Sequence, residues 1–175
     1  FGIAEVDESY IGGKDRNKHY SKKVKGTQGR NTLTKTPVVG ILQRGGDIKA
    51  NVVDNVKMIT LEKQIVENVK MGSKLYTDDF LSYSRIGKLY PHEVVKHGRG
   101  EYVRLGNIHT NSTESFWALF KRGYHGTYHS MSKKHLQRYV DEFVYRFNNR
   151  SSAFDRMFDG VINCVSVSDK LSYKT

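Results

Sequence analysis

The pattern of apolar and polar positions predicts three successive strands in the first third of the chain. Residues 3–11 read IAEVDESYI, an apolar and β-branched run with polar residues between. Residues 36–55 contain two further β-branched runs, joined by the sequence RGGD. Two such runs around a Gly-Gly pair are typical of a β-hairpin. We therefore expect a strand over 3–11 and a hairpin over 36–55.

From residue 58 onward the spacing of apolar residues changes. Residues 58–70 have apolar side chains at 61, 65, 66 and 69, which is the period of a helix. SKLYTDD at 73–79 and HEVVKH at 92–97 are short strand-like runs, and a short helix is expected over 80–90 between them. Strands that alternate with helices in this way predict a mixed α/β layered fold.

Two longer helical patterns follow. NSTESFWALFKRGY begins at residue 111, and SKKHLQRYVDEFVYRFNNR begins at residue 132. The second has its apolar residues on one helix face, at positions 136, 139, 140, 143, 144 and 147. Gly123 and Gly126 favour a loop between the two helices.

The charge of the chain indicates a polyanionic partner. A chain of 175 residues is the size of one domain, and it carries 29 Lys and Arg against 18 Asp and Glu, a net charge of +11. Nucleic acid is the leading candidate, and a solubilising surface charge is the alternative. Residues 14–35 are especially basic and have few apolar side chains, which predicts a mobile loop or arm. The arm either contacts phosphate or is an ordinary solvated loop. Its candidate DNA-binding residues are Lys14, Arg16, Lys18, Lys22, Lys23 and Lys25.

Cysteine usage and hydropathy favour an intracellular protein. Cys164 is the single cysteine of the sequence, so neither an intramolecular disulfide nor a Cys-rich zinc site can form. No apolar run is long enough for a membrane span, and no signal peptide opens the chain. We expect a cytoplasmic, nucleoid-associated protein. The chain starts without Met on a strand-like run, which indicates a fragment of a longer protein.

Two acidic positions fall where a strand is expected to be buried or to end. Asp7 lies on the first strand and Asp78 follows the fourth, and sites in open sheets tend to collect at strand ends. Carboxylates on nearby strands would form an oxygen-rich pocket suited to Mg²⁺ or Mn²⁺. Taken singly, Asp7 could instead terminate a strand, and Asp78 and Asp79 could be turn residues.

The helix expected from residue 111 supplies a third carboxylate. Glu114 and Lys121 share one helix face, because seven residues make nearly two turns. Phe116, Leu119 and Phe120 lie on the opposite side, where they would pack on the sheet, and Trp117 lies between the two faces as a structural residue. The alternative for Glu114 is a capping box with Asn111, in which its side chain bonds the backbone of the cap residue.

These residues, taken together, resemble a known family. Asp78 and Glu114 are separated by 35 residues, and Lys121 lies seven beyond Glu114. The order resembles the DDE signature of transposases and retroviral integrases. More closely, VDESYIGGKDRNKH, TDDFLSY, HTNSTESFWALFKRGYHGTYH and HLQRYVDEFVYRFNNR resemble the bacterial insertion-sequence transposases with a V-D-E-[ST]-[YF]-I-G-G-K motif. The resemblance implies an RNase H-like fold, a mixed five-stranded sheet flanked by helices, over residues 1–150, with 151–175 as a C-terminal helical extension of the same domain.

The resemblance also implies an activity and a site. Asp7, Asp78 and Glu114 match the metal-binding catalytic triad, with Asp79 as the alternative to Asp78, and the cofactor would be two Mg²⁺ or Mn²⁺ ions. The activity would be phosphodiester hydrolysis at transposon ends and strand transfer into target DNA, by a homo-oligomer in a synaptic complex. The alternatives are a DNA-binding relative without catalysis and an RNase H-like nuclease that only hydrolyses. Further candidate DNA-binding residues are Lys121, Arg122 and Tyr124, whose ring could stack on unpaired bases or simply pack in the protein.

Overall fold

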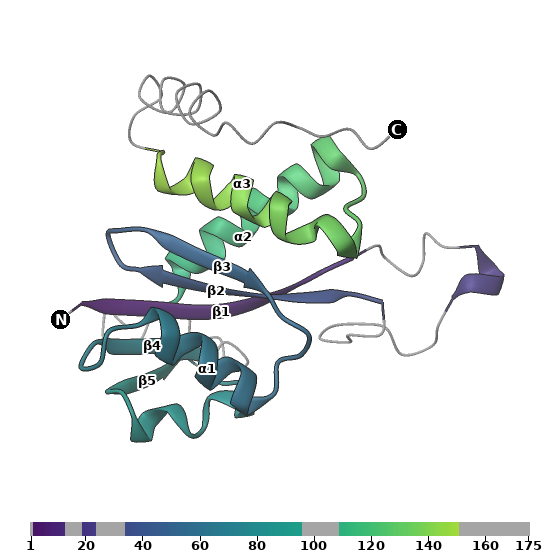
Figure 1. Cartoon of the computed structure of the whole chain (residues 1–175). Helices are drawn as coiled ribbons and strands as arrows, with labels where there is room; N and C mark the ends of the chain where they lie inside the picture. The colour runs from purple at the N-terminus through teal and green to yellow at the C-terminus, as the bar shows by residue number, and fades with distance from the viewer. Residues whose placement is uncertain (1, 13–18, 24–33, 96–108, 151–175) are drawn as a thin grey trace, which may run out of the picture.

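A mixed five-stranded sheet forms the centre of the molecule (Figure 1). The computed structural model describes residues 2–12, 19–23, 34–95 and 109–150. The predicted extension over 151–175 and most of the basic arm lie outside these ranges. The five strands are β1 (Ile3–Ile11), β2 (Thr36–Gln43), β3 (Ile48–Val52), β4 (Lys74–Asp78) and β5 (His92–Val95).

The strand order is β3-β2-β1-β4-β5. The first three strands form an antiparallel meander, whereas β4 is parallel to β1 and β5 is parallel to β4. The RGGD sequence makes the β2–β3 turn, where Gly45 has a φ of 75°, a value that glycine adopts without steric cost. Three antiparallel strands followed by two parallel crossovers are the RNase H-like arrangement, so the predicted fold is confirmed.

Helices cover both faces of the sheet (Figure 1). α1 (Met58–Asn68) packs on one face, where Leu61 and Ile65 join Val6 and Leu75 in a buried cluster. α2 (Asn111–Gly123) and α3 (Leu136–Asn148) pack on the other face through an aromatic cluster. Phe116 and Phe120 are fully buried there as predicted, while Leu119 is only partly buried.

The connection between α2 and α3 differs from the predicted loop. Residues Tyr124–Tyr128 form a π-helical turn that continues α2 directly. Gly123 is needed for packing: a Cβ there would lie 2.1 Å from Cζ of Phe143 on α3. The predicted loop therefore begins later, after residue 128, because Gly123 serves the close approach of two helices rather than the start of a loop.

The expected helix over 80–90 is also different in the structure. Two short 3-10 turns, Leu81–Tyr83 and Ile86–Lys88, take its place. Tyr83 and Ile86 are buried against the α1 side of the sheet. Over the described residues, no helix is both long and apolar enough to cross a membrane.

Candidate active site

Alternation along β1 places its acidic side chains on two faces of the sheet. Successive side chains of a strand point to opposite faces. Glu5 accepts hydrogen bonds from the backbone of α2, so Asp7, two residues later, also faces the α2 side. Glu8 faces the α1 side, where its Oε2 accepts a hydrogen bond of 2.9 Å from the Tyr83 hydroxyl.

The register between β1 and β4 brings Asp78 beside Asp7. Val6 pairs with Thr77 in the parallel ladder, so Asp7 and Asp78 occupy the next register position. Neighbouring residues on paired strands project from the same face of a sheet. Asp79 is exposed and lies one residue beyond the end of β4. The geometry therefore brings Asp78, rather than Asp79, together with Asp7.

Gly40 allows α2 to cross the sheet close to Asp7. It is the ladder partner of Asp7 on β2, and a Cβ at this position would lie 2.8 Å from Cζ2 of Trp117. A larger residue would push α2 off the sheet. Trp117 is buried in this contact, as predicted for a structural residue.

Glu114 lies in the first turn of α2 and is exposed. The hydroxyl of Thr110 donates to its Oε1 over 3.5 Å. Thr110 is the N-cap residue of α2, and no cap side chain bonds the helix backbone. The N-cap is therefore Thr110 and not Asn111, the residue that the capping-box alternative assumed.

The three predicted ligands interact electrostatically. Burial raises the pKa of Asp7 to about 7, with further increases from the negative charges of Glu8, Asp78 and Glu114, while the hydrogen bond from the Glu8 amide lowers it. Burial also raises the pKa of Tyr83 well above its ordinary value, and Glu8, Asp7 and Asp78 add to that effect. A proton or a cation would relieve this accumulation of negative charge.

The donor set fits a hard divalent cation in its chemistry. Carboxylate oxygens are the ligands that Mg²⁺ and Mn²⁺ prefer. Within the described ranges, no three His, Cys, Asp or Glu side chains form a ready metal cage. Mg²⁺ keeps several waters and is usually held by only one or two carboxylates, so a closed protein cage is not required. Asp78 and Glu114 thus act electrostatically on Asp7, and within the described ranges the three side chains do not enclose an ion site.

The predicted DNA-binding residues of α2 and the turn after it line two different pockets. Lys121 is exposed and lines a pocket of about 130 Å³ together with Tyr10, Lys35, Tyr124 and His125. Tyr124 is buried against the α2–α3 core, which favours its packing role. Arg122 lines a different groove, of about 550 Å³. The same groove is lined by Arg146 of α3 and by Arg150, which follows the end of that helix.

The basic arm is described only in part. Lys22 belongs to a 3-10 turn at Tyr20–Lys22, and Lys23 is exposed. Figure 1 shows this turn projecting beyond the end of the sheet. The remaining arm candidates, Lys14, Arg16, Lys18 and Lys25, lie outside the described residues.

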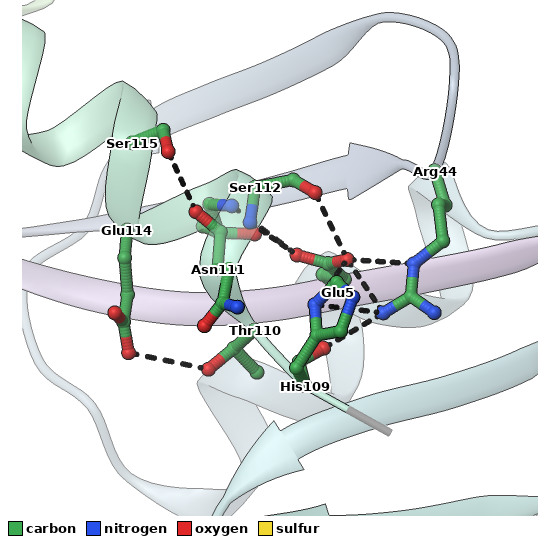
Figure 2. Close-up of polar contacts among 9 residues, drawn as sticks. Glu5, Arg44, His109, Thr110, Asn111, Ser112, Glu114 and Ser115 are labelled. Atoms are coloured by element: carbon green, nitrogen blue, oxygen red, sulfur yellow. Dashed lines mark hydrogen bonds and ion pairs between the residues drawn. The ribbon is translucent and has the colours of Figure 1, made fainter. Parts of the chain in front are cut away.

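Sequence reasoning missed Glu5. Its side chain is completely buried, and Figure 2 shows its carboxylate directed at the start of α2, between Ser112 and Arg44. The signal was present: a carboxylate at an inward position of a buried strand requires donors. Asp7 was the predicted site residue on this strand instead, because it matches the catalytic aspartate of the family motif.

The topology of the sheet, with helices on both faces and acidic residues of β1 and β4 side by side, defines an RNase H-like domain. The ISXO2-like transposase domain family matches residues 1–148. The chain belongs to this family, and the prediction of a DDE-type insertion-sequence transposase is confirmed at that level.

Individual proteins resemble the chain as well. An uncharacterized transposase-like protein of Haemophilus influenzae is 32% identical over 99 residues, which cover 56% of this chain and 78% of the relative. Among solved structures, the Mos1 transposase paired-end complex with left transposon end has a TM-score of 0.42 and 14% identity, over 85% of this chain. The chain spans 51% of the length of that transposase chain.

Proposed function

We propose that the chain is the catalytic domain of a DNA transposase, which hydrolyses phosphodiester bonds at transposon ends and joins the freed 3′-hydroxyl to target DNA. The observation that carries this proposal is that Asp7 and Asp78 directly follow the last β1–β4 pair, Val6 and Thr77, and that the charges of Asp78 and Glu114 both act on Asp7. Membership of a transposase family supports the choice of substrate.

Asp7, Asp78 and Glu114 would hold two Mg²⁺ or Mn²⁺ ions. When bound, such ions activate a water or a 3′-hydroxyl for attack on phosphorus and stabilise the leaving oxygen. The protein orients the carboxylates: the Glu8 amide donates to Oδ1 of Asp7 over 2.9 Å, and the Phe80 amide donates to Oδ1 of Asp78 over 3.1 Å. Both aspartates therefore sit on rigid strands with one oxygen oriented by the backbone.

Lys121 would hold the DNA strand next to the acidic residues. It lies two turns beyond Glu114 on the same face of α2, and its pocket also contains Lys35 and His125. Cations in such a pocket attract a phosphodiester backbone. The basic arm and Arg122 would extend this contact along the DNA. Since transposition joins two ends, the proposed partners are DNA and a second copy of the chain, acting on the nucleoid.

The test compares plasmid nicking by variants at two acidic positions, Asp7 and Asp79. Asp7→Asn is expected to lower the rate of Mg²⁺-dependent nicking of supercoiled DNA by roughly 10²–10³-fold. DNA affinity, measured by fluorescence anisotropy, should stay within about twofold, because the substitution removes no DNA-binding cation. The matched control is Asp79→Asn, which changes an exposed carboxylate outside the pair and should nick like the parent. Equal nicking by Asp7→Asn and the parent would refute the assignment.

Strand transfer separates the proposed activity from its alternatives. The protein should join an oligonucleotide with a free 3′-hydroxyl to a plasmid in the presence of Mg²⁺. Nicking without joining would identify a nuclease that only hydrolyses. Binding with neither reaction would identify a relative that has lost catalysis.

A further inference from the structure

Glu5 is a carboxylate buried in the middle of the domain. Its side chain is 0% exposed on β1, two residues before Asp7. An ionised carboxylate in such a place is strongly destabilising unless charged or hydrogen-bonding partners compensate for the lost water. Its partners therefore indicate what the residue does.

Two backbone amides at the start of α2 donate to Glu5. Oε2 accepts from the amides of Ser112 and Thr113, at 3.0 and 3.2 Å, and Oε1 accepts from the Ser112 hydroxyl at 3.1 Å (Figure 2). The amides of the first turn have no partner inside a helix. The first amide bonded within the α2 region is that of Glu114, which donates to the Thr110 carbonyl.

Glu5 thus performs the function of an N-cap from a different strand. The N-cap residue of α2 makes no side-chain hydrogen bond to the helix backbone. Glu5 accepts from two first-turn amides that would otherwise be left to water. A negative charge at this end of a helix is further stabilised by the helix dipole. These hydrogen bonds tie the first turn of α2 to the first half of β1.

Arg44 completes the anchor from the β2–β3 turn. Its Nε donates to Oε1 of Glu5 over 2.8 Å, and its Nη2 donates to the carbonyl of His109 over 2.8 Å. The guanidinium also lies over the ring of Tyr76, 4.9 Å from the ring centre. Arg44 therefore holds both the carboxylate and the segment that leads into α2.

We infer that Glu5 is a positioning residue that sets the place of Glu114 relative to Asp7. Glu114 follows directly after Thr113, whose amide Glu5 holds, and Asp7 follows Glu5 on the same face of β1. Asp7 and Glu114 are far apart along the chain. The hydrogen bond from the Thr113 amide to Glu5 connects the strand that carries Asp7 to the helix turn that carries Glu114. The catalytic consequence rests on the proposed function, whereas the anchoring of α2 does not.

Hydrogen exchange of individual amides tests the anchor directly. In Glu5→Gln, the amides of Ser112 and Thr113 should lose protection about tenfold relative to amides of β2, because one acceptor oxygen is replaced by a donor. The control is Ser115→Ala, which removes a side-chain bond to the Asn111 carbonyl in the same turn and leaves Glu5 unchanged. Protection of these two amides that falls no further than that of the β2 amides would overturn the inference.

A double variant covers the case in which Glu5→Gln does not fold. Glu5→Leu with Arg44→Met removes both charges at similar volume, and such replacements of buried ion pairs are often neutral for stability. The domain should fold, with the first turn of α2 still exchanging about tenfold faster. Protection equal to the parent would reduce Glu5 to a structural ion-pair partner.

The Mg²⁺ dependence of nicking tests the effect on the site. The double variant should need severalfold more Mg²⁺ for half-maximal nicking, with DNA affinity unchanged, because Glu114 is less well placed. An unchanged Mg²⁺ requirement would overturn the positioning role. If the parent itself does not nick, the proposed function fails, and hydrogen exchange still decides whether Glu5 anchors α2.

Discussion

Glu5 and Asp7 are two carboxylates on one face of one strand, and their surroundings differ completely. Glu5 is fully buried and surrounded by donors: two amides, a hydroxyl and a guanidinium. Asp7 is half-buried, and its strongest electrostatic neighbours are other acids. Glu5 is held by donors, while the charges that act on Asp7 come from Glu8, Asp78 and Glu114 and are all negative.

This difference separates a structural carboxylate from one suited to a ligand. The chain supplies every donor that Glu5 needs, so its charge contributes to holding β1, the β2–β3 turn and α2 together. At Asp7 the chain instead places the charges of Asp78 and Glu114, an arrangement of like charges that favours the protonated form of Asp7 and, in the proposed function, a bound cation. Burial alone does not distinguish the two carboxylates. The neighbouring groups decide whether the negative charge raises or lowers the stability of the fold.

The largest expected effect on stability is at Glu5, whose carboxylate is held by donors. Glu5→Gln should lower the free energy of unfolding by about 3 kcal/mol, because the change leaves the Arg44 guanidinium without its carboxylate and repels the α2 amides. Urea unfolding followed by circular dichroism measures it. Asp79→Asn, an exposed change, should stay within about 0.5 kcal/mol. A loss below about 1 kcal/mol for Glu5→Gln would contradict the ion-pair description.

At Asp7, unlike Glu5, the negative charge should lower the free energy of unfolding, and the pH dependence of stability should show this. The pKa of Asp7 is about 7 in the folded protein against 3.8 without its surroundings, so the folded state binds the proton more tightly. The stability from this group is complete below pH 4 and is lost as the pH rises through 7. Without metal, the free energy of unfolding should fall by about 2 kcal/mol over this range, a value that allows for solvent screening.

Asp7→Asn removes that titration and provides the control. In EDTA, this variant should have a flatter pH profile than the parent and a higher free energy of unfolding at pH 7.5. A variant less stable than the parent at that pH would mean that Asp7 is compensated as fully as Glu5.

Metal addition should produce the smallest of the three effects. Mg²⁺ at tenfold above its dissociation constant should stabilise the parent by about 1.4 kcal/mol at pH 7.5, because only the folded state brings the carboxylates together. Thermal unfolding with and without Mg²⁺ measures the shift, and Ca²⁺ tests selectivity. Asp7→Asn should lose most of the stabilisation. An equal shift in both proteins would place the ion elsewhere.

Much of the fold could be predicted from local patterns. Residues 3–11 were expected to form a strand and do so as β1, and the RGGD turn and the helix at 58–70 were also correct in type. Errors arose where a residue served a distant contact. Gly123 reads locally as a helix breaker, but it makes room for Phe143. The segment at 80–90 needs to bury only Tyr83 and Ile86, for which two 3-10 turns suffice.

By itself the sequence determined which residue types were available for chemistry: the acids at 7, 78 and 114, a cationic arm, and strands and helices in RNase H-like order. The tertiary structure alone decided how they combine. Register chose Asp78 over Asp79, Gly40 let α2 approach Asp7, and Glu5 became an anchor because α2 begins against it. The reason is physical: the energy of a charge depends on groups within a few ångströms, and folding chooses those neighbours from distant parts of the chain.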